Sequence, residues 1–267
     1  MASLQQFSLY AAFAPSKLQH ILSILSAVTG MRPISLLQQH ILFSPSISGH
    51  GSSTSVVTGG AAVSVAPLES SRIDVSRDLP QNLDEKENAK PPEWTLTIPT
   101  IPESGKRPVQ VQAISKTKFR PSEEIDQNVD NISTLFRFLR ALDYVYAYDY
   151  LERGYIFVYN GIATIKISQI SPQLPLQLHE IPMGGDGDQV ASTVARGRDP
   201  DNAKFVNTWV VHAYVEIVTG PETVGDDSEK VKIAIERLES LKAEIGGLFE
   251  LEIPDRALLD PRVQMRR

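Results

Sequence analysis

Hydrophobic and polar residues along this chain follow two different periods. A period of two, or a short apolar run between turn residues, predicts strands. The strand candidates are Gln6–Ala14, Ile34–Phe43, Glu93–Pro99, Val109–Lys118, Tyr144–Leu151, Tyr155–Asn160, Ile162–Ile170, Leu174–Ile181, Lys204–Thr219 and Phe249–Ile253. Arg153-Gly154 is predicted as the turn of a hairpin between two of them. We expect about eight or nine strands in total.

A spacing of three and four residues predicts three helices. The first has Leu18, Ile21, Leu22, Leu25 and Val28 on one face, and Gly30 follows where a helix C-cap is expected. The second covers Asn131–Leu142, and the third follows Thr223–Glu229 and ends near Gly246. Strands follow one another without regular alternation with helices. The pattern therefore predicts an α+β fold, an antiparallel β-barrel with about three flanking helices, because closure of a sheet removes its edges.

Composition breaks this pattern once. Ser44–Ala66 is rich in Ser, Gly, Thr and Val, and Glu69–Pro92 is charged and polar. Such segments bury too little apolar surface to offset the entropy of ordering. We therefore predict a single β-barrel domain over residues 1–267 with a flexible insertion at 45–91, and a second loop at Met183–Ala203.

Composition and charge exclude several classes of protein. The 267 residues include 26 Lys and Arg, 32 Asp and Glu and no Cys, so the formal charge is −6. Disulfides, thiolate nucleophiles and Cys-ligated metals are excluded. The acidity argues against direct nucleic-acid binding. The apolar N-terminus lacks the basic region of a signal peptide, and no apolar run is long enough for a membrane span.

Motifs for catalysis are missing from the sequence. It has no G-x-S-x-G and no phosphate-binding loop, and the histidines lack metal-ligand spacing. They are expected to be surface or packed structural residues: His20, His40, His50, His179 and His212. We predict no catalytic residues, no bound cofactor and no metal site.

One acidic pair offers an alternative. Glu250 and Glu252 share one face of a predicted strand and could bind Mg²⁺ or Mn²⁺ if that face lined the barrel. Tunnel-type RNA triphosphatases use such pairs, so a ring of inward charges of both signs would favour a metal-dependent triphosphate hydrolase. The opposite phase, with Leu251 and Ile253 inward and both glutamates in water, is the preferred reading. A third possibility is an empty lumen that binds a small apolar ligand.

Aromatic residues suggest a protein interface. Alternation places four tyrosines of one strand on the same face, and Tyr combines apolar area with a polar tip. Another strand, within Phe205–Val218, is strongly apolar. The predicted interface residues are Tyr144, Tyr146, Tyr148, Tyr150, Trp209 and Tyr214.

The order of these segments resembles the Mediator subunit 18 family of fungi. The resemblance covers most of Phe7–Phe43 and Glu93–Val263 and includes FSLYAAFAPSKLQHILSILSAVTGMRP, FRFLRALDYVYAYDYLERGYIFVYNGIATIKISQI and the C-terminal ALLDPRV. It implies a barrel similar in fold to RNA triphosphatases but without catalysis. It also implies a nuclear coactivator subunit in the Mediator head module that regulates RNA polymerase II transcription. The implied partners are Mediator subunit 20, as a heterodimer, and the C-terminal helix of Mediator subunit 8, with indirect contact to the polymerase machinery.

Overall fold

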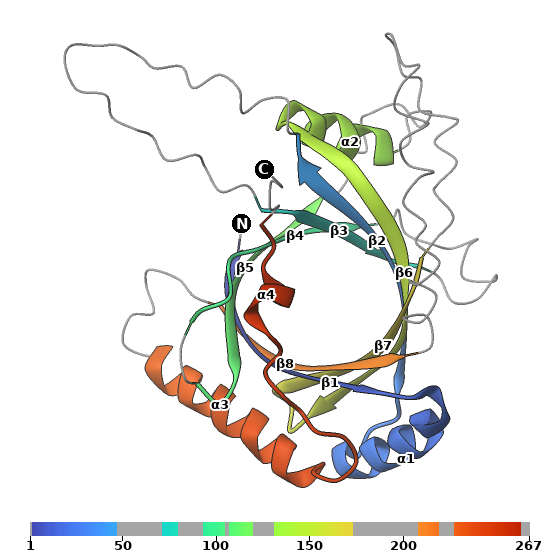
Figure 1. Ribbon diagram of the computed structural model, residues 1–267, viewed down its shortest axis with the longest axis vertical. Coiled ribbons are helices and arrows are strands. Elements are labelled where there is room, and N and C mark those ends of the chain that lie inside the picture. The colour runs from blue at the N-terminus through green and yellow to red at the C-terminus, as the bar shows by residue number, and fades with distance from the viewer. Residues whose placement is uncertain are drawn as a thin grey trace.

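The computed structural model describes residues 2–46, 71–79, 93–104, 107–119, 131–172, 208–218 and 227–262. These residues contain eight long strands arranged as a closed barrel in the order β1-β5-β4-β3-β2-β6-β7-β8, with β8 paired to β1 (Figure 1). Every pairing is antiparallel. The strands are β1 (Ala2–Phe13), β2 (Ile34–Pro45), β3 (Ile73–Asp78), β4 (Trp94–Pro99), β5 (Gln110–Phe119), β6 (Tyr144–Tyr159), β7 (Ala163–Pro172) and β8 (Trp209–Val218). The predicted antiparallel barrel is confirmed.

The helices lie on the outside of this barrel. They are α1 (Leu18–Thr29), which follows the short 3-10 turn η1 (Pro15–Lys17), α2 (Asn131–Ala141), α3 (Asp227–Glu244) and the short α4 (Arg256–Leu259). Figure 1 shows α1 and α3 beside one side of the ring and α2 at the opposite side. The predicted C-cap of α1 is confirmed, since Gly30 has a left-handed φ of 65°.

The apolar core lies between the barrel wall and the helices. Phe7 of β1 and Val211 of β8 are fully buried in one cluster with Leu25 of α1 and Leu238 of α3. A second cluster joins β2, β3 and β4 to α2. Since side chains alternate along a strand, the opposite face of each strand points into the lumen. The apolar core of this protein therefore lies outside the barrel. The residues that alternate with the core residues along each strand point into the lumen.

The C-terminal residues 249–262, here called the strap, pass in front of one end of the barrel beside β5 (Figure 1). The strap begins with two backbone hydrogen bonds of 2.8 Å between Tyr10 and Glu252. It ends at an antiparallel bridge between Ser71 and Arg262, where Arg72 N donates to Pro261 O. The predicted strand Phe249–Ile253 is thus reduced to an isolated bridge at Glu252.

Two sequence predictions about strands are wrong. The insertion predicted at 45–91 contains the strand β3. In this strand Ile73 and Val75 alternate with polar residues that point into a polar lumen. The predicted turn at Arg153-Gly154 lies within the single strand β6. A Cβ on Gly154 would lie 2.0 Å from Ile167 O, so glycine permits a close approach of β6 to β7. The predicted elements at Leu174–Ile181 and Met183–Ala203 lie outside the described residues.

Candidate functional site

The lumen is lined largely by polar and charged side chains. By the pairing registers and the position of the core, the polar lumen-facing residues include Gln6, Ser8, Tyr10, Gln38, His40, Asp74, Ser76, Asp78, Gln110, Gln112, Lys116, Lys118, Tyr148, Tyr150, Glu152, Lys166, His212, Tyr214 and Glu216. Charges of both signs are therefore present, which is the pattern that would favour the hydrolase alternative. Their mutual distances decide what they can do.

His40 is the centre of one charged network. Its Nδ1 donates to the carboxylate of Asp74 at 3.1 Å, and its Nε2 lies 3.0 Å from Glu152. Lys166 reaches the same glutamate at 2.9 Å, and the ring of Tyr150 stacks on His40 with centroids 4.8 Å apart. Burial opposes protonation of His40, but the hydrogen bond to Asp74 and the negative charge of the nearby Glu152 raise its pKa to about 9. His40 is therefore a buried imidazolium at neutral pH.

Glu152 is held as a carboxylate by the same contacts. Burial alone would raise the pKa of Glu152, but the close contact with His40 and the charge of Lys166 lower it well below its usual range. A carboxylate in this state already has two cationic partners. It is a poor proton donor and a poor ligand for an added metal ion.

A second network joins three adjacent strands. Lys116 of β5 lies 2.6 Å from Glu216 of β8, and Gln6 of β1 donates to the same carboxylate oxygen at 2.9 Å. Nearer one end of the barrel, Lys118 pairs with Glu93 at 2.8 Å. The lysines that line the described lumen thus each contact a carboxylate.

The aromatic part of the lumen surrounds a second, partly buried histidine. His212 stacks between Tyr10, at a centroid distance of 4.4 Å, and Tyr214, at 4.7 Å. Burial and the nearby Lys166 lower the pKa of His212 to about 3, so its ring is neutral at physiological pH. Its Nε2 has no hydrogen-bond partner. The expected packed histidine is confirmed here, and His20 is exposed on α1 as expected. His50 and His179 lie outside the described residues.

The acidic pair of the alternative function lies outside the lumen. Glu250 and Glu252 are exposed on the strap, and Leu251 between them is buried against the core. The expected exposure of both glutamates and the burial of Leu251 are therefore confirmed, but Ile253, which was expected to point inward, is 41% exposed. Within the described residues, no group of three or more His, Asp and Glu could hold a metal ion.

The four tyrosines of β6 do not share one face, contrary to the sequence prediction. The β2–β6 register shifts between Leu42 and Phe43. Before the shift, Tyr144 and Tyr146 pair with Pro45 and Phe43 and pack on the α2 cluster. After it, Tyr148 and Tyr150 face the lumen. A β-bulge, which alternation along one strand cannot reveal, causes the division.

The other predicted interface residues are also divided. Trp209 is only 7% exposed and packs against Phe13 and Tyr155 in the core. Tyr214 is half-buried beside His212. Of the six predicted interface residues, only Tyr148, at 50%, is among the exposed large hydrophobic residues.

Exposed apolar residues that the sequence prediction missed lie close to Tyr148 in the chain. Phe138 lies in α2 and Leu142 just after its end, one helical turn later, and Val145 is the second residue of β6; each is about half exposed. With Tyr148, on the lumen side of β6, they are the exposed large apolar residues of the stretch 138–148, which we call the α2–β6 patch. Helical spacing could have identified Phe138, because it lies off the buried stripe of Leu135 and Leu139.

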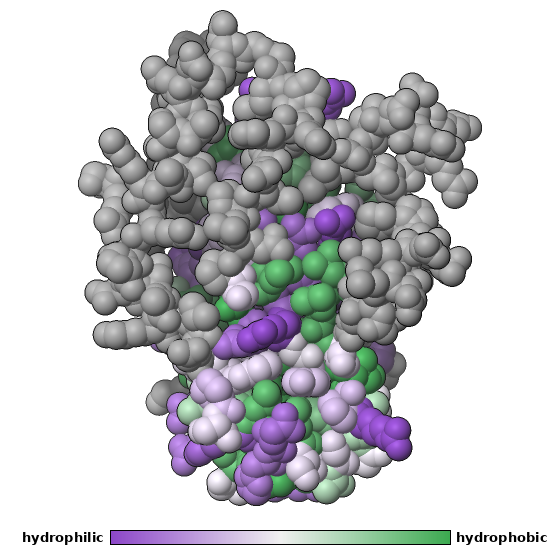
Figure 2. Space-filling model, turned by 90° about the vertical axis from the view of Figure 1, so that its right-hand side faces the viewer, coloured by the Kyte–Doolittle hydropathy of each residue, from purple (hydrophilic) through white to green (hydrophobic). Residues whose placement is uncertain are grey.

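The barrel wall between α1 and α2 is also partly apolar. Figure 2 shows this face, with apolar surface over the middle of the wall and hydrophilic side chains across and below it. On the outward side of the strands, Leu37 and Leu151 are half-buried. Arg153 donates to Gln169 beside them at 2.7 Å. Mixed apolar and hydrogen-bonding surface of this kind is typical of protein interfaces.

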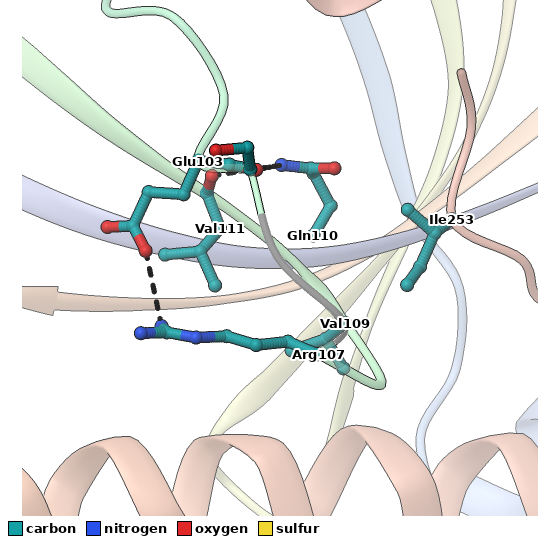
Figure 3. A pocket seen from close by; sticks show the side chains of 7 residues that line it. Glu103, Arg107, Val109, Gln110, Val111 and Ile253 are labelled. Carbon is teal, nitrogen blue, oxygen red and sulfur yellow. Dashed lines mark hydrogen bonds and ion pairs between the residues drawn. The ribbon is translucent and has the colours of Figure 1, made fainter. Parts of the chain in front are cut away.

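A shallow pocket opens between the β4–β5 connection and the strap (Figure 3). Glu103 pairs with Arg107 across it at 3.3 Å, and Gln110 donates to Val111 O at 3.0 Å. Ile253 lies on the opposite side in Figure 3. The polar groups of the pocket are engaged with one another and do not converge on a ligand. No helix in the described part of the chain is both long and apolar enough to cross a membrane.

Comparison with known proteins agrees with this fold. The family model described as Med18 protein matches residues 5–262. A curated relative from Yarrowia lipolytica, Mediator of RNA polymerase II transcription subunit 18, is 29% identical over 98% of this chain and 100% of its own length. The relative of the same name from Candida glabrata is 24% identical over 64% of this chain and 52% of its own length.

Among solved structures, a chain in the structure of the Schizosaccharomyces pombe Mediator head module matches with a TM-score of 0.59 at 11% identity. The match covers 94% of this chain and 98% of that chain, and at this identity it shows a shared fold. The family model and the barrel agree with the resemblance carried by the ordered segments of the sequence. The chain belongs to the Med18 protein family.

Proposed function

We infer that this protein is a non-enzymatic subunit of the Mediator coactivator, which regulates RNA polymerase II transcription through protein–protein contacts in the head module. The observation that carries this conclusion is the family match over residues 5–262. The full-length similarity to the Yarrowia lipolytica subunit supports it. With this role, we propose that the protein acts in the nucleus and does not contact membranes.

The chemistry of the lumen supports a scaffold role over hydrolysis. Triphosphate hydrolysis of the tunnel type needs metal-binding carboxylates and cations free to bind phosphate. Here Glu152 and Glu216 are engaged by Lys166, His40 and Lys116. A phosphate-release assay with Mn²⁺ and a nucleoside triphosphate distinguishes the two functions. Activity that disappears in the Glu250→Ala/Glu252→Ala double variant would establish the hydrolase instead.

The partners that we propose are Mediator subunit 20, as a heterodimer, and the C-terminal helix of Mediator subunit 8. Contact with the polymerase machinery is indirect. The net charge of −6 suits a protein that leaves nucleic acid to other subunits. Co-expression of the three proteins followed by size-exclusion chromatography tests this assignment. Co-elution is expected at micromolar concentration, and separate elution of this chain would contradict it.

The surface that we assign to partner binding is the α2–β6 patch. Four apolar side chains about half exposed on consecutive elements are unusual unless they meet a partner. Tyr148 supplies an aromatic anchor of the kind that carries much of the energy in interfaces. Trp209 contributes indirectly, because its ring supports the barrel wall from within the core.

A further inference from the structure

The pairing of β3 with β4 is the shortest strand pairing in the barrel. β3 has six residues, and its register with β4 covers only three residue pairs, whereas β1 and β8 share ten. Backbone hydrogen bonds therefore hold β3, like the equally short β4, less firmly than the longer strands. Side chains must supply the remaining attachment.

Two kinds of side-chain contact hold β3. On the outer face, Ile73 and Val75 are buried beneath α2. On the lumen face, Asp74 binds His40 of β2, which also contacts Glu152 of β6. Lys166 of β7 completes the connection through Glu152. The imidazole ring of β2 thus links β3 to β6, and through Glu152 to β7, along neighbouring strands of the barrel wall.

The strap depends on the same strand. Ser71, two residues before β3, bridges to Arg262, and Arg72 N donates to Pro261 O at 3.0 Å. The Arg262 side chain is itself fixed by Asp260 at 2.6 Å. The end of the strap is therefore attached to the beginning of β3, and the position of β3 decides whether that attachment can form.

We propose that His40 is a charge-operated clamp: its imidazolium holds β3 in the barrel, and β3 in turn holds the end of the strap. Loss of the charge leaves the two carboxylates without their shared cation. β3 and residues 256–262 then open together, while the core beneath α1 and α3 stays closed. The inference rests on the fold and is independent of the proposed function.

The surroundings of His40 favour the charged ring from every neighbouring strand. Asp74 and Ser76 face it from β3, and Tyr150 and Glu152 from β6; Lys166 of β7 contacts Glu152. With the pKa of His40 raised to about 9, the clamp is closed at neutral pH and opens in alkali. Tyr150 stays protonated across this range, because burial raises its pKa.

Hydrogen exchange of the full chain, followed by mass spectrometry, tests the proposal. In His40→Gln at pH 7.5, exchange in residues 71–79 and 256–262 is expected to rise about tenfold or more, with α1 and α3 unchanged. His212→Gln is the matched control, since it removes a lumen histidine that is neutral and lies on β8. It should leave residues 71–79 at the wild-type rate.

A pH series separates the clamp from a general packing defect. Between pH 7.5 and 10, after correction for intrinsic exchange, the wild type should approach the exchange pattern of His40→Gln. Asp74→Asn, which keeps the size of the side chain, should reproduce the same regional opening if His40→Gln does not fold. Uniform acceleration over the whole barrel in these variants, or no acceleration at residues 71–79, would overturn the proposal.

Discussion

Lys116 of β5 and Glu216 of β8 form a 2.6 Å ion pair that spans β1, the strand between their own two strands. Gln6 of β1 binds the same carboxylate. One glutamate therefore connects the three strands at which the barrel closes. Because the side chains of Lys116 and Glu216 are 33% and 23% exposed, solvent screens their attraction.

A double-mutant cycle with Lys116→Met and Glu216→Gln should give a coupling energy of only about 0.5–1 kcal/mol. Urea unfolding of the four proteins measures it. The loss in Glu216→Gln alone should exceed the coupling, because Gln6 also loses a charged acceptor. A coupling of several kcal/mol would show that the lumen is much drier at this seam than these exposures imply.

Stability should be greatest near pH 6.5. The folded pKa of His40 is raised to about 9, so its contribution is full below the unfolded pKa of about 6.5 and is lost as pH rises through 9. The folded pKa of His212 is lowered to about 3, so its neutral form stabilises the fold above pH 6.5 and loses that effect as pH falls. Urea midpoints from pH 4 to pH 10 measure both slopes.

Histidine variants assign these slopes. His40→Gln should abolish most of the alkaline slope, on the order of 2–3 kcal/mol, and His212→Gln should flatten the acid slope below pH 6.5. An unchanged alkaline slope in His40→Gln would mean that another group releases the proton on unfolding. Because the pKa of Glu152 is lowered, this residue reduces folding stability only when the pH falls below the ordinary pKa range of carboxyl groups.

Gly154→Ala should destabilise the barrel severely, by roughly 3 kcal/mol or more, or prevent folding. The added methyl would meet Ile167 O at 2.0 Å and the Ser168 Cα at 2.8 Å, both backbone atoms of β7 that cannot rotate away. Thermal unfolding checks the result. Gly161→Ala is the control: it has a φ of 71° but open space around it, and should cost only about 1 kcal/mol.

Tyr148→Asp should weaken co-elution with the proposed Mediator partners while leaving the thermal midpoint of the isolated protein within a few degrees of wild type. The reason is that Tyr148 is half exposed, so its replacement removes little buried surface. Trp209→Ala should act in the opposite way, lowering stability by about 3–5 kcal/mol through loss of a buried ring. If Tyr148→Asp lowered stability as much as Trp209→Ala, the assignment of Tyr148 to the interface would be wrong.

Local periodicity predicted most individual elements. The helical face of α1 and its Gly30 cap, the alternation of Val109–Lys118 and the long α2 and α3 helices all follow from neighbours in sequence. The assignment to a barrel also followed, because so many strands in succession need closure to remove their edges.

Periodicity could not predict which face of each strand lines the lumen. A period of two looks the same whether the apolar face turns inward or outward. Only the position of α1 and α3 shows that Phe7 and Val211 lie outside the lumen, and therefore that Gln6 and His212 lie inside. For the same reason the sequence of β3 resembles a polar insertion, although its polar residues alternate with buried ones and face a charged lumen.

Contacts between distant strands set the remaining features. The bulge that separates Tyr146 from Tyr148 is a property of the β2–β6 pair, and the need for Gly154 comes from β7. His40, Asp74, Glu152 and Lys166 come from four strands and have no common sequence motif. No inspection of one segment could have joined them.

The pairing of β1 with β8 also has a consequence for synthesis on the ribosome. Phe13 finds its partner only when Trp209 has emerged, and at about 5–20 residues per second the intervening chain takes roughly 10–40 s to make. During that interval the amphipathic strand β1 does not yet have β8 as its neighbour. In a nascent chain of this topology, the edge of β1 that pairs with β8 stays without that partner until translation is nearly complete.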